Sequence, residues 1–194
     1  MSSRSILIVD NFDSFTFNLF QLLQESTKLE VQVIREDLLS TLEVLPEPAA
    51  LVLSPGPGAP LDHPVDLQLL QQLAPKIPIL GVCLGHQLIA HFFGAKVPPS
   101  GAPFHGRVCP VLHNRMGLFA GLPNPASFMR YHSLAVDRDS LTPELLIDAE
   151  TADGMIMALR HKSLPIFGVQ FHPESFLSPD GARLIRNFLD LCEG

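Results

Sequence analysis

Short apolar runs alternate along the chain with segments that carry one apolar face. Apolar runs of this length are typical of β-strands, and they lie at residues 6–9, 31–33, 50–53, 78–82 and 166–171. Leucine and phenylalanine at spacings of three and four residues indicate amphipathic helices, which are expected near residues 15–23, 67–73, 84–92 and 180–192. Strands and helices therefore alternate through the first half of the chain and again at its end.

This alternation predicts an α/β fold with an open, mostly parallel central sheet flanked by helices. From residue 96 to about 166 the apolar stretches are shorter and are separated by Gly, Pro, Asn and Asp, which indicates an additional antiparallel section. The length of 194 residues suits one domain with a substantial core, so residues 1–194 are expected to form a single domain. In such sheets, functional sites form at the carboxyl ends of the strands.

Composition narrows the class of ligand and the compartment. A net charge of -7 without a Lys/Arg cluster argues against nucleic acid or an anionic membrane as a partner, and no uncharged apolar run is long enough to span a bilayer. The scattered cysteines, Cys83, Cys109 and Cys192, argue against a disulfide framework. The first residues lead directly into a strand without an export signal. We therefore expect a cytoplasmic protein that acts on a small ligand.

The strand at residues 78–82 ends at a cysteine flanked by two glycines, Gly81-x-Cys83-x-Gly85. This spacing matches the strand–turn–helix elbow that presents a nucleophile in hydrolases, because small neighbours let the backbone turn tightly. A helix N-terminus also favours the thiolate form of cysteine. Taken alone, the motif fits a buried structural cysteine equally well, so residues elsewhere in the chain must decide between the two interpretations.

The last apolar run is followed by His172-Pro173-Glu174. A nucleophilic cysteine needs a base to take its proton and an acceptor that orients the base, and Cys83, His172 and Glu174 supply all three groups. Amide or ester chemistry also needs donors for the developing oxyanion. The backbone N–H of Leu84 is one candidate, and the loop Pro55-Gly56-Pro57-Gly58 is a second, although by itself this loop could be only a rigid turn.

The other polar residues carry weaker signals. His86 stands three residues after Cys83, but no second Cys/His pair has zinc-like spacing, so we predict no metal site. Direct catalysis by His132 is not expected, because His172 already has a carboxylate nearby. The remaining histidines are interpreted as surface or structural residues: His63, His91, His113 and His161. We expect three acidic residues to form a solvated edge: Asp148, Glu150 and Asp153.

Motifs spread over the whole chain resemble those of class I (triad-type) glutamine amidotransferases. Within this class the sequence is similar to the small glutaminase subunit, component II, of anthranilate synthase or aminodeoxychorismate synthase. The segments that carry the resemblance are residues 9–16 (VDNFDSFT), 54–58 (SPGPG), 81–87 (GVCLGHQ), 105–106 (HG), 130–134 (RYHSL) and 168–175 (GVQFHPES). Phe17 and Arg107 depart from the residues that are usual in this family, but neither belongs to the triad.

The resemblance implies Cys83 as the nucleophile, His172 as the general base and Glu174 as the group that orients the base. It assigns the oxyanion donors to the backbone of Gly56 and Leu84. The other residues that it implies for glutamine binding are Gly58, Gln87, Ser133 and Leu134. By the same resemblance, the chain hydrolyses glutamine through a glutamyl thioester and supplies ammonia to a separate chorismate-binding synthase subunit, component I.

No cofactor is implied for this chain, whereas the partner synthase of this family uses Mg²⁺. Anthranilate and aminodeoxychorismate both remain open as the product of the complex. Two alternatives share the fold: a stand-alone γ-glutamyl hydrolase or peptidase that keeps the triad, and a catalytically idle subunit that regulates a partner. The complete set of Cys83, His172 and Glu174 argues against the idle subunit, because such a copy has no chemical reason to keep all three.

Overall fold

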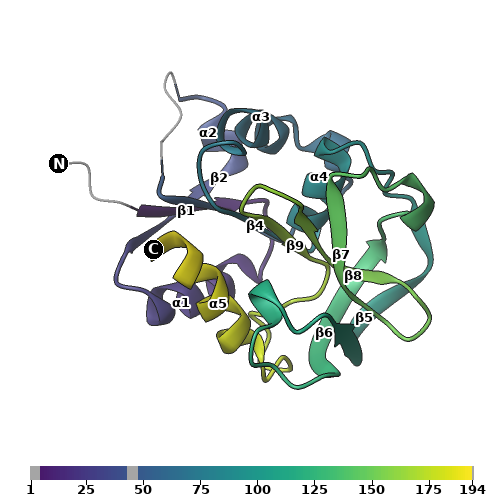
Figure 1. The fold of residues 1–194 in the computed structure, drawn as a ribbon. Coiled ribbons are helices and arrows are strands. Elements are labelled where there is room, and N and C mark those ends of the chain that lie inside the picture. The colour runs from purple at the N-terminus through teal and green to yellow at the C-terminus, as the bar shows by residue number, and fades with distance from the viewer. Residues whose placement is uncertain (1–4, 43–47, 194) are drawn as a thin grey trace.

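One continuous sheet organises the protein in this computed structural model (Figure 1). The structure describes residues 5–42 and 48–193, and for residues 102, 103, 105 and 193 it describes the backbone alone. The side chain of His105, which belongs to one of the family motifs, therefore lies outside the described part.

The sheet has nine strands within the described residues, and it joins a parallel part to an antiparallel part. Across the sheet, the order is β2 (Glu30–Arg35), β1 (Ser5–Asp10), β3 (Ala50–Leu53), β4 (Ile79–Val82), β9 (Ile166–Val169), β8 (Ile156–His161), β7 (Leu145–Glu150), β5 (Pro99–His113) and β6 (Ala126–Leu134). Pairing is parallel from β2 to β9 and antiparallel from β9 to β6. The predicted α/β fold is confirmed, in the form of a mixed sheet.

Helices cover both faces of the parallel part (Figure 1). One face carries α1 (Thr16–Ser26) and α5 (Gly181–Glu193), and the other carries α2 (Glu36–Leu39), α3 (Pro64–Leu73) and α4 (Leu84–Phe92). Ile6 and Ile8 of β1 pack with α1 and α5, whereas Leu7 and Val9 pack with α3 and α4. Successive residues of a strand point to opposite faces of the sheet. Because helices cover both faces, successive residues are apolar, which explains the continuous apolar runs.

The parallel strands end at one edge of the sheet, where three loops meet. The Pro-Gly loop (residues 55–58) follows β3, Cys83 follows β4, and His172 lies just after β9. The register of β3, β4 and β9 aligns Leu53, Gly81 and Gly168 across neighbouring strands. Segments far apart in the sequence are thereby brought to one place. Among the described residues, no helix is both long enough and apolar enough to cross a membrane.

One expectation about the antiparallel part is wrong. Asp148 is 3% exposed and belongs to no solvated edge. Its carboxylate accepts hydrogen bonds from Asn114 Nδ2 at 2.6 Å and from Arg160 Nε at 2.9 Å. The pairing of β7 with β8 shifts register between Ile147 and Ala149, and this irregularity breaks the alternation of exposed and buried positions.

Candidate active site

Cys83 occupies the turn between β4 and α4, and its backbone angles are φ 53° and ψ -99°. Residues other than glycine seldom adopt a positive φ, and such strain is concentrated where a turn presents a functional group. The N–H of Cys83 donates to Val169 O at 2.8 Å, which ties the turn to β9. The thiol therefore lies at the N-terminus of α4, in the strand–turn–helix arrangement that the elbow motif predicts.

Close backbone contacts require the two glycines of this elbow. A Cβ atom on Gly81 would lie 2.3 Å from the carbonyl carbon of Gly85, and a Cβ atom on Gly85 would lie 2.3 Å from the carbonyl oxygen of Leu53. Non-bonded atoms do not approach so closely in a packed interior. Larger residues would push α4 away from β3 and β4, and the thiol would move with the helix.

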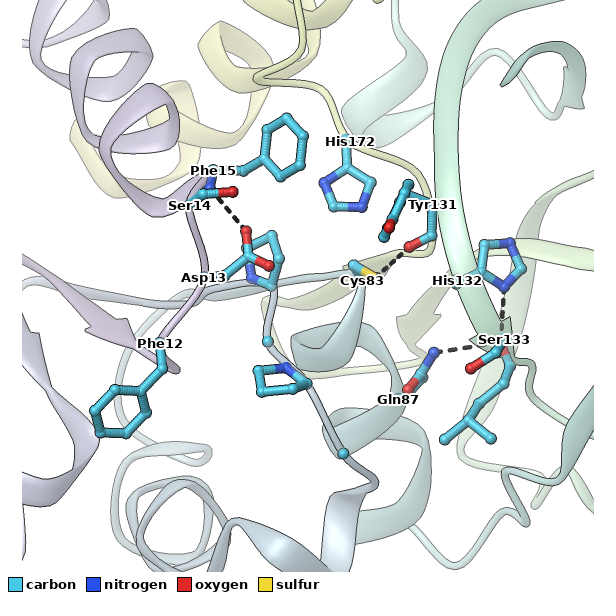
Figure 2. Close-up of a pocket in the computed structure, with 15 residues that line it drawn as sticks. Phe12, Asp13, Ser14, Phe15, Cys83, Gln87, Tyr131, His132, Ser133 and His172 are labelled. Atoms are coloured by element: carbon cyan, nitrogen blue, oxygen red, sulfur yellow. Dashed lines mark hydrogen bonds between the residues drawn. The ribbon is translucent and has the colours of Figure 1, made fainter. Parts of the chain in front are cut away.

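His172 and Glu174 form a buried pair in the loop after β9. His172 Nδ1 lies 2.6 Å from Glu174 Oε1. The backbone N–H of His172 donates to Met129 O at 2.9 Å, and its carbonyl accepts from Ser178 Oγ at 2.6 Å, so both the ring and the main chain are held. The ring lies beside Cys83 (Figure 2). Its Nε2 has no hydrogen-bond partner among the described residues, which leaves it available to take a proton.

The surroundings of His172 favour its charged form. Burial opposes the positive charge, but the adjacent Cys83 and Glu174 outweigh burial and raise the pKa of His172 well above its ordinary value. Because Nδ1 faces a carboxylate oxygen, the neutral ring carries its proton on Nδ1 and its lone pair on Nε2. This arrangement suits transfer of the thiol proton from Cys83 to His172.

Cys83 opens into a cavity of about 690 Å³, which is large enough for a small ligand. The cavity is lined by residues 12–15, 55–58 and 131–134 together with Cys83, Gln87 and His172. Five of the predicted glutamine-binding residues line it: Gly56, Gly58, Gln87, Ser133 and Leu134. The side chain of Leu84 is instead buried against Gly56, so the backbone N–H of Leu84 is the group that this residue can offer.

The Pro-Gly loop is held close to the elbow from two sides. A Cβ atom on Gly56 would lie 2.6 Å from Asn11 Cβ and 2.6 Å from Leu84 Cδ2. The N–H of Asn11 donates to Ser54 Oγ at 3.0 Å, and Ser54 Oγ in turn donates to Pro55 O at 2.8 Å. Glycine at position 56 therefore allows the loop backbone to approach both the β1–α1 loop and the start of α4.

Gln87 lies in the first turn of α4, and two hydrogen bonds hold its side-chain amide in place. Its Nε2 donates to Leu134 O at 3.3 Å, as Figure 2 shows, and to Gln170 Oε1 at 3.1 Å. Gln170 Nε2 lies 3.7 Å from Cys83 Sγ. Both amide hydrogens of Gln87 are used in this way, so its Oε1 is the atom that could accept a hydrogen bond from a ligand.

His132 forms part of the cavity wall. Its Nδ1 donates to Leu134 O at 2.7 Å, and its Nε2 accepts from Arg130 Nε at 3.3 Å. Burial and, to a smaller extent, the charge on Arg130 lower the pKa of His132 to about 4, so the ring is neutral near pH 7. Both ring nitrogens are occupied by the protein itself, which suits a structural role.

The structure adds three contributors that sequence reasoning missed. Gln170 contacts the thiol of Cys83, and the carbonyl of Tyr131 accepts a hydrogen bond from Cys83 Sγ at 3.6 Å. The ring of Phe15 packs against that of His172, with 5.2 Å between the two ring centroids. The period of two along an extended chain places residues 170 and 172 on the same side, and this signal could have revealed Gln170. The contributions of Phe15 and of the Tyr131 carbonyl depend on tertiary structure.

His86 does not pair with Cys83. It is completely buried beside Gly168, where an added Cβ would lie 2.8 Å from His86 Nδ1. Burial lowers the pKa of His86 to about 3, so the ring is neutral. It fills space between α4 and β9 and is not among the residues that line the cavity.

The family follows from a comparison with known proteins. The family model for glutamine amidotransferase class-I matches residues 7–192. This chain belongs to the class-I glutamine amidotransferase family. A solved structure from Thermoplasma acidophilum, named as part of a GMP synthase, superimposes with a TM-score of 0.85 at 27% identity and covers 100% of this chain and 96% of that one.

Relatives within the family are closer in sequence. The chain is 48% identical to anthranilate synthase component 2 of Pseudomonas aeruginosa, and the match covers 95% of this chain and 94% of that protein. It is 44% identical to aminodeoxychorismate synthase component 2 of Escherichia coli, over 95% of this chain and 98% of that protein. It is also 42% identical to bifunctional protein TrpGD of Thermotoga maritima, but the match, over 97% of this chain, spans only 32% of that longer protein.

Proposed function

We propose that this chain is the glutaminase subunit of a chorismate-using synthase, either anthranilate synthase or aminodeoxychorismate synthase, and that it hydrolyses glutamine to glutamate and ammonia. The observation that carries the proposal is the meeting of a strained elbow cysteine, a histidine–carboxylate pair and a glycine-containing loop in one cavity. Component 2 relatives with either name match nearly the full chain, which supports a subunit over a stand-alone hydrolase.

In the first half of the proposed reaction, His172 Nε2 takes the thiol proton of Cys83, and Sγ attacks the side-chain amide carbon of glutamine. As the C–S bond forms, the carbonyl oxygen becomes an oxyanion, which the backbone N–H groups of Gly56 and Leu84 stabilise. Glu174 stabilises the imidazolium. The imidazolium then gives its proton to the amide nitrogen, the C–N bond breaks, and ammonia leaves a glutamyl thioester on Cys83.

In the second half, His172 takes a proton from a water molecule, and the water oxygen attacks the thioester carbon. The same backbone donors stabilise the second oxyanion. The C–S bond then breaks, the sulfur receives the proton from His172, and glutamate leaves. Each of these proposed steps uses side chains and backbone amides of this chain.

The polar wall of the cavity orients the substrate. Gln87 Oε1 accepts from the α-ammonium group of glutamine, and the backbone around Ser133 and Leu134 binds its α-carboxylate. Gly58 lines the same pocket without a side chain and leaves room for the methylene groups. A ligand held at its α-carbon in this way presents its side-chain amide to Cys83, which favours glutamine over a smaller amide.

Ammonia produced at this edge of the sheet is consumed by the synthase partner, component I. Phe12, at the cavity, is 54% exposed, and Phe17, at the start of α1, is 65% exposed. Exposed aromatic side chains beside a site are typical of protein contact surfaces. Within the complex, the partner's active site decides between anthranilate and aminodeoxychorismate as the product.

The decisive experiment separates ammonia production from ammonia use. Cys83→Ser should abolish synthesis from glutamine in the reconstituted pair and leave synthesis from ammonium salts at the wild-type rate. The partner is identified beforehand by co-purification from native extract. Equal loss of both activities would contradict the proposal, and release of glutamate from γ-glutamyl peptides in preference to glutamine would favour a stand-alone hydrolase.

A further inference from the structure

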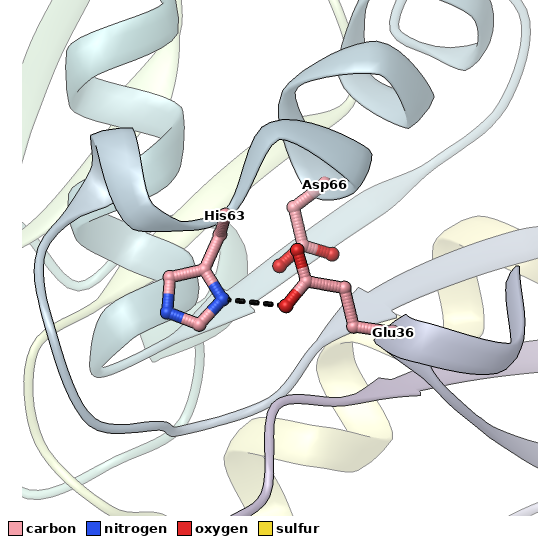
Figure 3. A group of neighbouring side chains, drawn as sticks. All are labelled: Glu36, His63 and Asp66. Carbon is pink, nitrogen blue, oxygen red and sulfur yellow. Dashed lines mark hydrogen bonds and ion pairs between the residues drawn. The ribbon is translucent and has the colours of Figure 1, made fainter. Parts of the chain in front are cut away.

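A second cluster of titratable residues lies outside the cavity, behind the Pro-Gly loop. It consists of Glu36 at the start of α2, His63 immediately before α3, and Asp66 in the first turn of α3 (Figure 3). These residues are 8%, 6% and 0% exposed, respectively. Charged groups are seldom buried without a structural or functional reason, because desolvation is costly.

His63 links this cluster to the Pro-Gly loop. Its Nε2 lies 2.9 Å from the carbonyl oxygen of Pro57, and its Nδ1 lies 2.8 Å from Glu36 Oε2. A carbonyl only accepts hydrogen bonds, so Nε2 carries a proton and donates it to Pro57. Pro57 stands between Gly56 and Gly58, and all three line the cavity. The bond from His63 therefore fixes the Pro57–Gly58 peptide, which lies two peptide units along the loop from the proposed oxyanion donor, the N–H of Gly56.

Asp66 links the cluster to the other side of the loop. Both of its carboxylate oxygens are buried without a hydrogen-bond partner among the described residues, and the same is true of Asn11 Oδ1. Asn11 is a polar side chain beside Asp66 that also packs against Gly56, and although it lowers the pKa of Asp66, burial and the charge of Glu36 outweigh it. A protonated Asp66 could donate its O–H to Asn11 Oδ1, which would satisfy two buried atoms with one hydrogen bond.

The three residues offer possible cation ligands within 4.8 Å of one another. However, both nitrogens of His63 are already engaged, Nε2 with Pro57 and Nδ1 with Glu36. The separation of 2.8 Å between Nδ1 and Oε2 is that of a hydrogen bond that contains a proton. The geometry therefore favours protons over a metal ion in this cluster.

We infer that Glu36, His63 and Asp66 form a positioning network that holds the Pro-Gly loop at two points, at Pro57 through His63 and at Gly56 through Asn11, and so places the N–H of Gly56 for oxyanion stabilisation. Glu36 orients the ring of His63, which carries the contact with the loop. This inference rests on the proposed glutaminase function. It assigns a role to three residues that touch neither substrate nor Cys83.

Two nearly isosteric variants of His63 provide the test. The amide nitrogen of Gln can replace Nε2 of His63 and keep the bond to Pro57, whereas that of Asn can replace Nδ1 and keep only the bond to Glu36. We expect His63→Asn to lower kcat for glutamine hydrolysis about 10- to 100-fold, since misplacing an oxyanion donor costs up to ~10²–10³ in rate. His63→Gln should retain most of the activity, and KM should change little in both variants.

Alkylation of Cys83 by iodoacetamide supplies the matched readout, because displacement of iodide passes through no oxyanion. Its rate should stay at the wild-type value in both His63 variants. Asp148→Asn is the control for replacing a buried carboxylate, and it should leave kcat unchanged. Equal kcat values for His63→Asn and His63→Gln, or a parallel loss of alkylation, would refute the network.

If His63→Asn does not fold, Asp66 allows the same comparison. Asp66→Asn keeps a donor for Asn11 Oδ1, whereas Asp66→Ala removes it, so only the Ala variant should lose kcat. Absence of glutamine hydrolysis in the wild-type chain with its partner would instead overturn the proposed function itself. Binding of Zn²⁺ to the wild-type chain, measured by calorimetry and abolished by His63→Gln, would replace the proton network with a metal site.

Discussion

His172 Nδ1 lies 2.6 Å from Glu174 Oε1, although only Pro173 separates the two residues in the sequence. The chain turns here, since the N–H of Ser175 donates to His172 O at 3.3 Å, and this turn brings the carboxylate beside the ring. The orientation of the base is therefore set locally. Its placement beside Cys83 depends on the pairing of β4 with β9, which joins distant parts of the chain.

This relationship predicts unequal effects of the two triad variants. His172→Asn removes the base and should lower glutamine turnover by ~10⁴-fold or more, as in related triads. Glu174→Gln should cost less, because Gln keeps an acceptor oxygen for Nδ1–H and loses only the charge that stabilises the imidazolium. Single-turnover glutamate release measures both. A Glu174→Gln variant slower than His172→Asn would contradict the assigned roles.

The elbow predicts a large effect of a single methyl group. Gly85→Ala should destabilise the protein by about 3 kcal/mol or more and reduce alkylation of Cys83, because its Cβ would collide with the carbonyl of Leu53. Gly154→Ala is the matched control. Gly154 has φ 86° but open space around it, so backbone strain alone should cost about 1 kcal/mol. Urea unfolding of the two variants compares them, and equal losses would refute the steric argument.

Asp66 predicts a pH dependence of stability. Burial, together with the negative charge of Glu36, raises the pKa of Asp66 from 3.8 to about 7. Between these values the folded protein holds a proton that the unfolded chain has released, so the free energy of unfolding falls as the pH rises from about 4 to 7. One pKa unit corresponds to roughly 1.4 kcal/mol, so this single group lowers the free energy of unfolding by about 4 kcal/mol in total over that pH range.

Asp66→Asn removes this titration, so its stability relative to wild type should increase as the pH is raised from 5 to 8. Against the effect of burial, the pKa of His63 is also raised, mainly by its bonds to Pro57 and Glu36 and less by the charge of Asp66, so the variant keeps most of the decline in stability that His63 causes. Urea unfolding at several pH values measures the slopes. The exposed Asp190→Asn variant controls for a change in net charge and should keep the wild-type slope. A wild-type slope in Asp66→Asn would show that Asp66 is ionised in the folded protein.

Control by the partner is the fourth prediction. We expect the isolated chain to hydrolyse glutamine slowly and the synthase with chorismate to accelerate it, because turnover without a consumer would waste ammonia. A small shift of the Pro-Gly loop that aligns Gly56 would suffice, since one oxyanion donor is worth about 3–4 kcal/mol, or ~10²–10³ in rate. Glutaminase turnover is measured on the chain alone and then in the complex. Full activity of the isolated chain would contradict gating.

Sequence patterns were sufficient for the architecture of the parallel part. Apolar runs such as residues 50–53 are buried on both faces of the sheet, and the helix period of residues 184–188 marks the buried face of α5. Leu191 follows the same period but is 45% exposed. The antiparallel part was predicted only as a class. Its irregular pairing, as around Asp148, depends on contacts between strands that no local period records.

The candidate site divides in the same way. Local sequence determined the elbow at Cys83 and the pair of His172 with Glu174, because tight turns and neighbouring side chains require particular residues at fixed spacings. Only the tertiary structure decided what surrounds them. It brings Gln170 to the thiol, the carbonyl of Tyr131 to Sγ, and His63 to the back of the Pro-Gly loop. These contacts join strands and loops far apart in the chain. Their partners are determined by sheet order and packing, which depend on many residues acting together and which no local pattern in the sequence reveals.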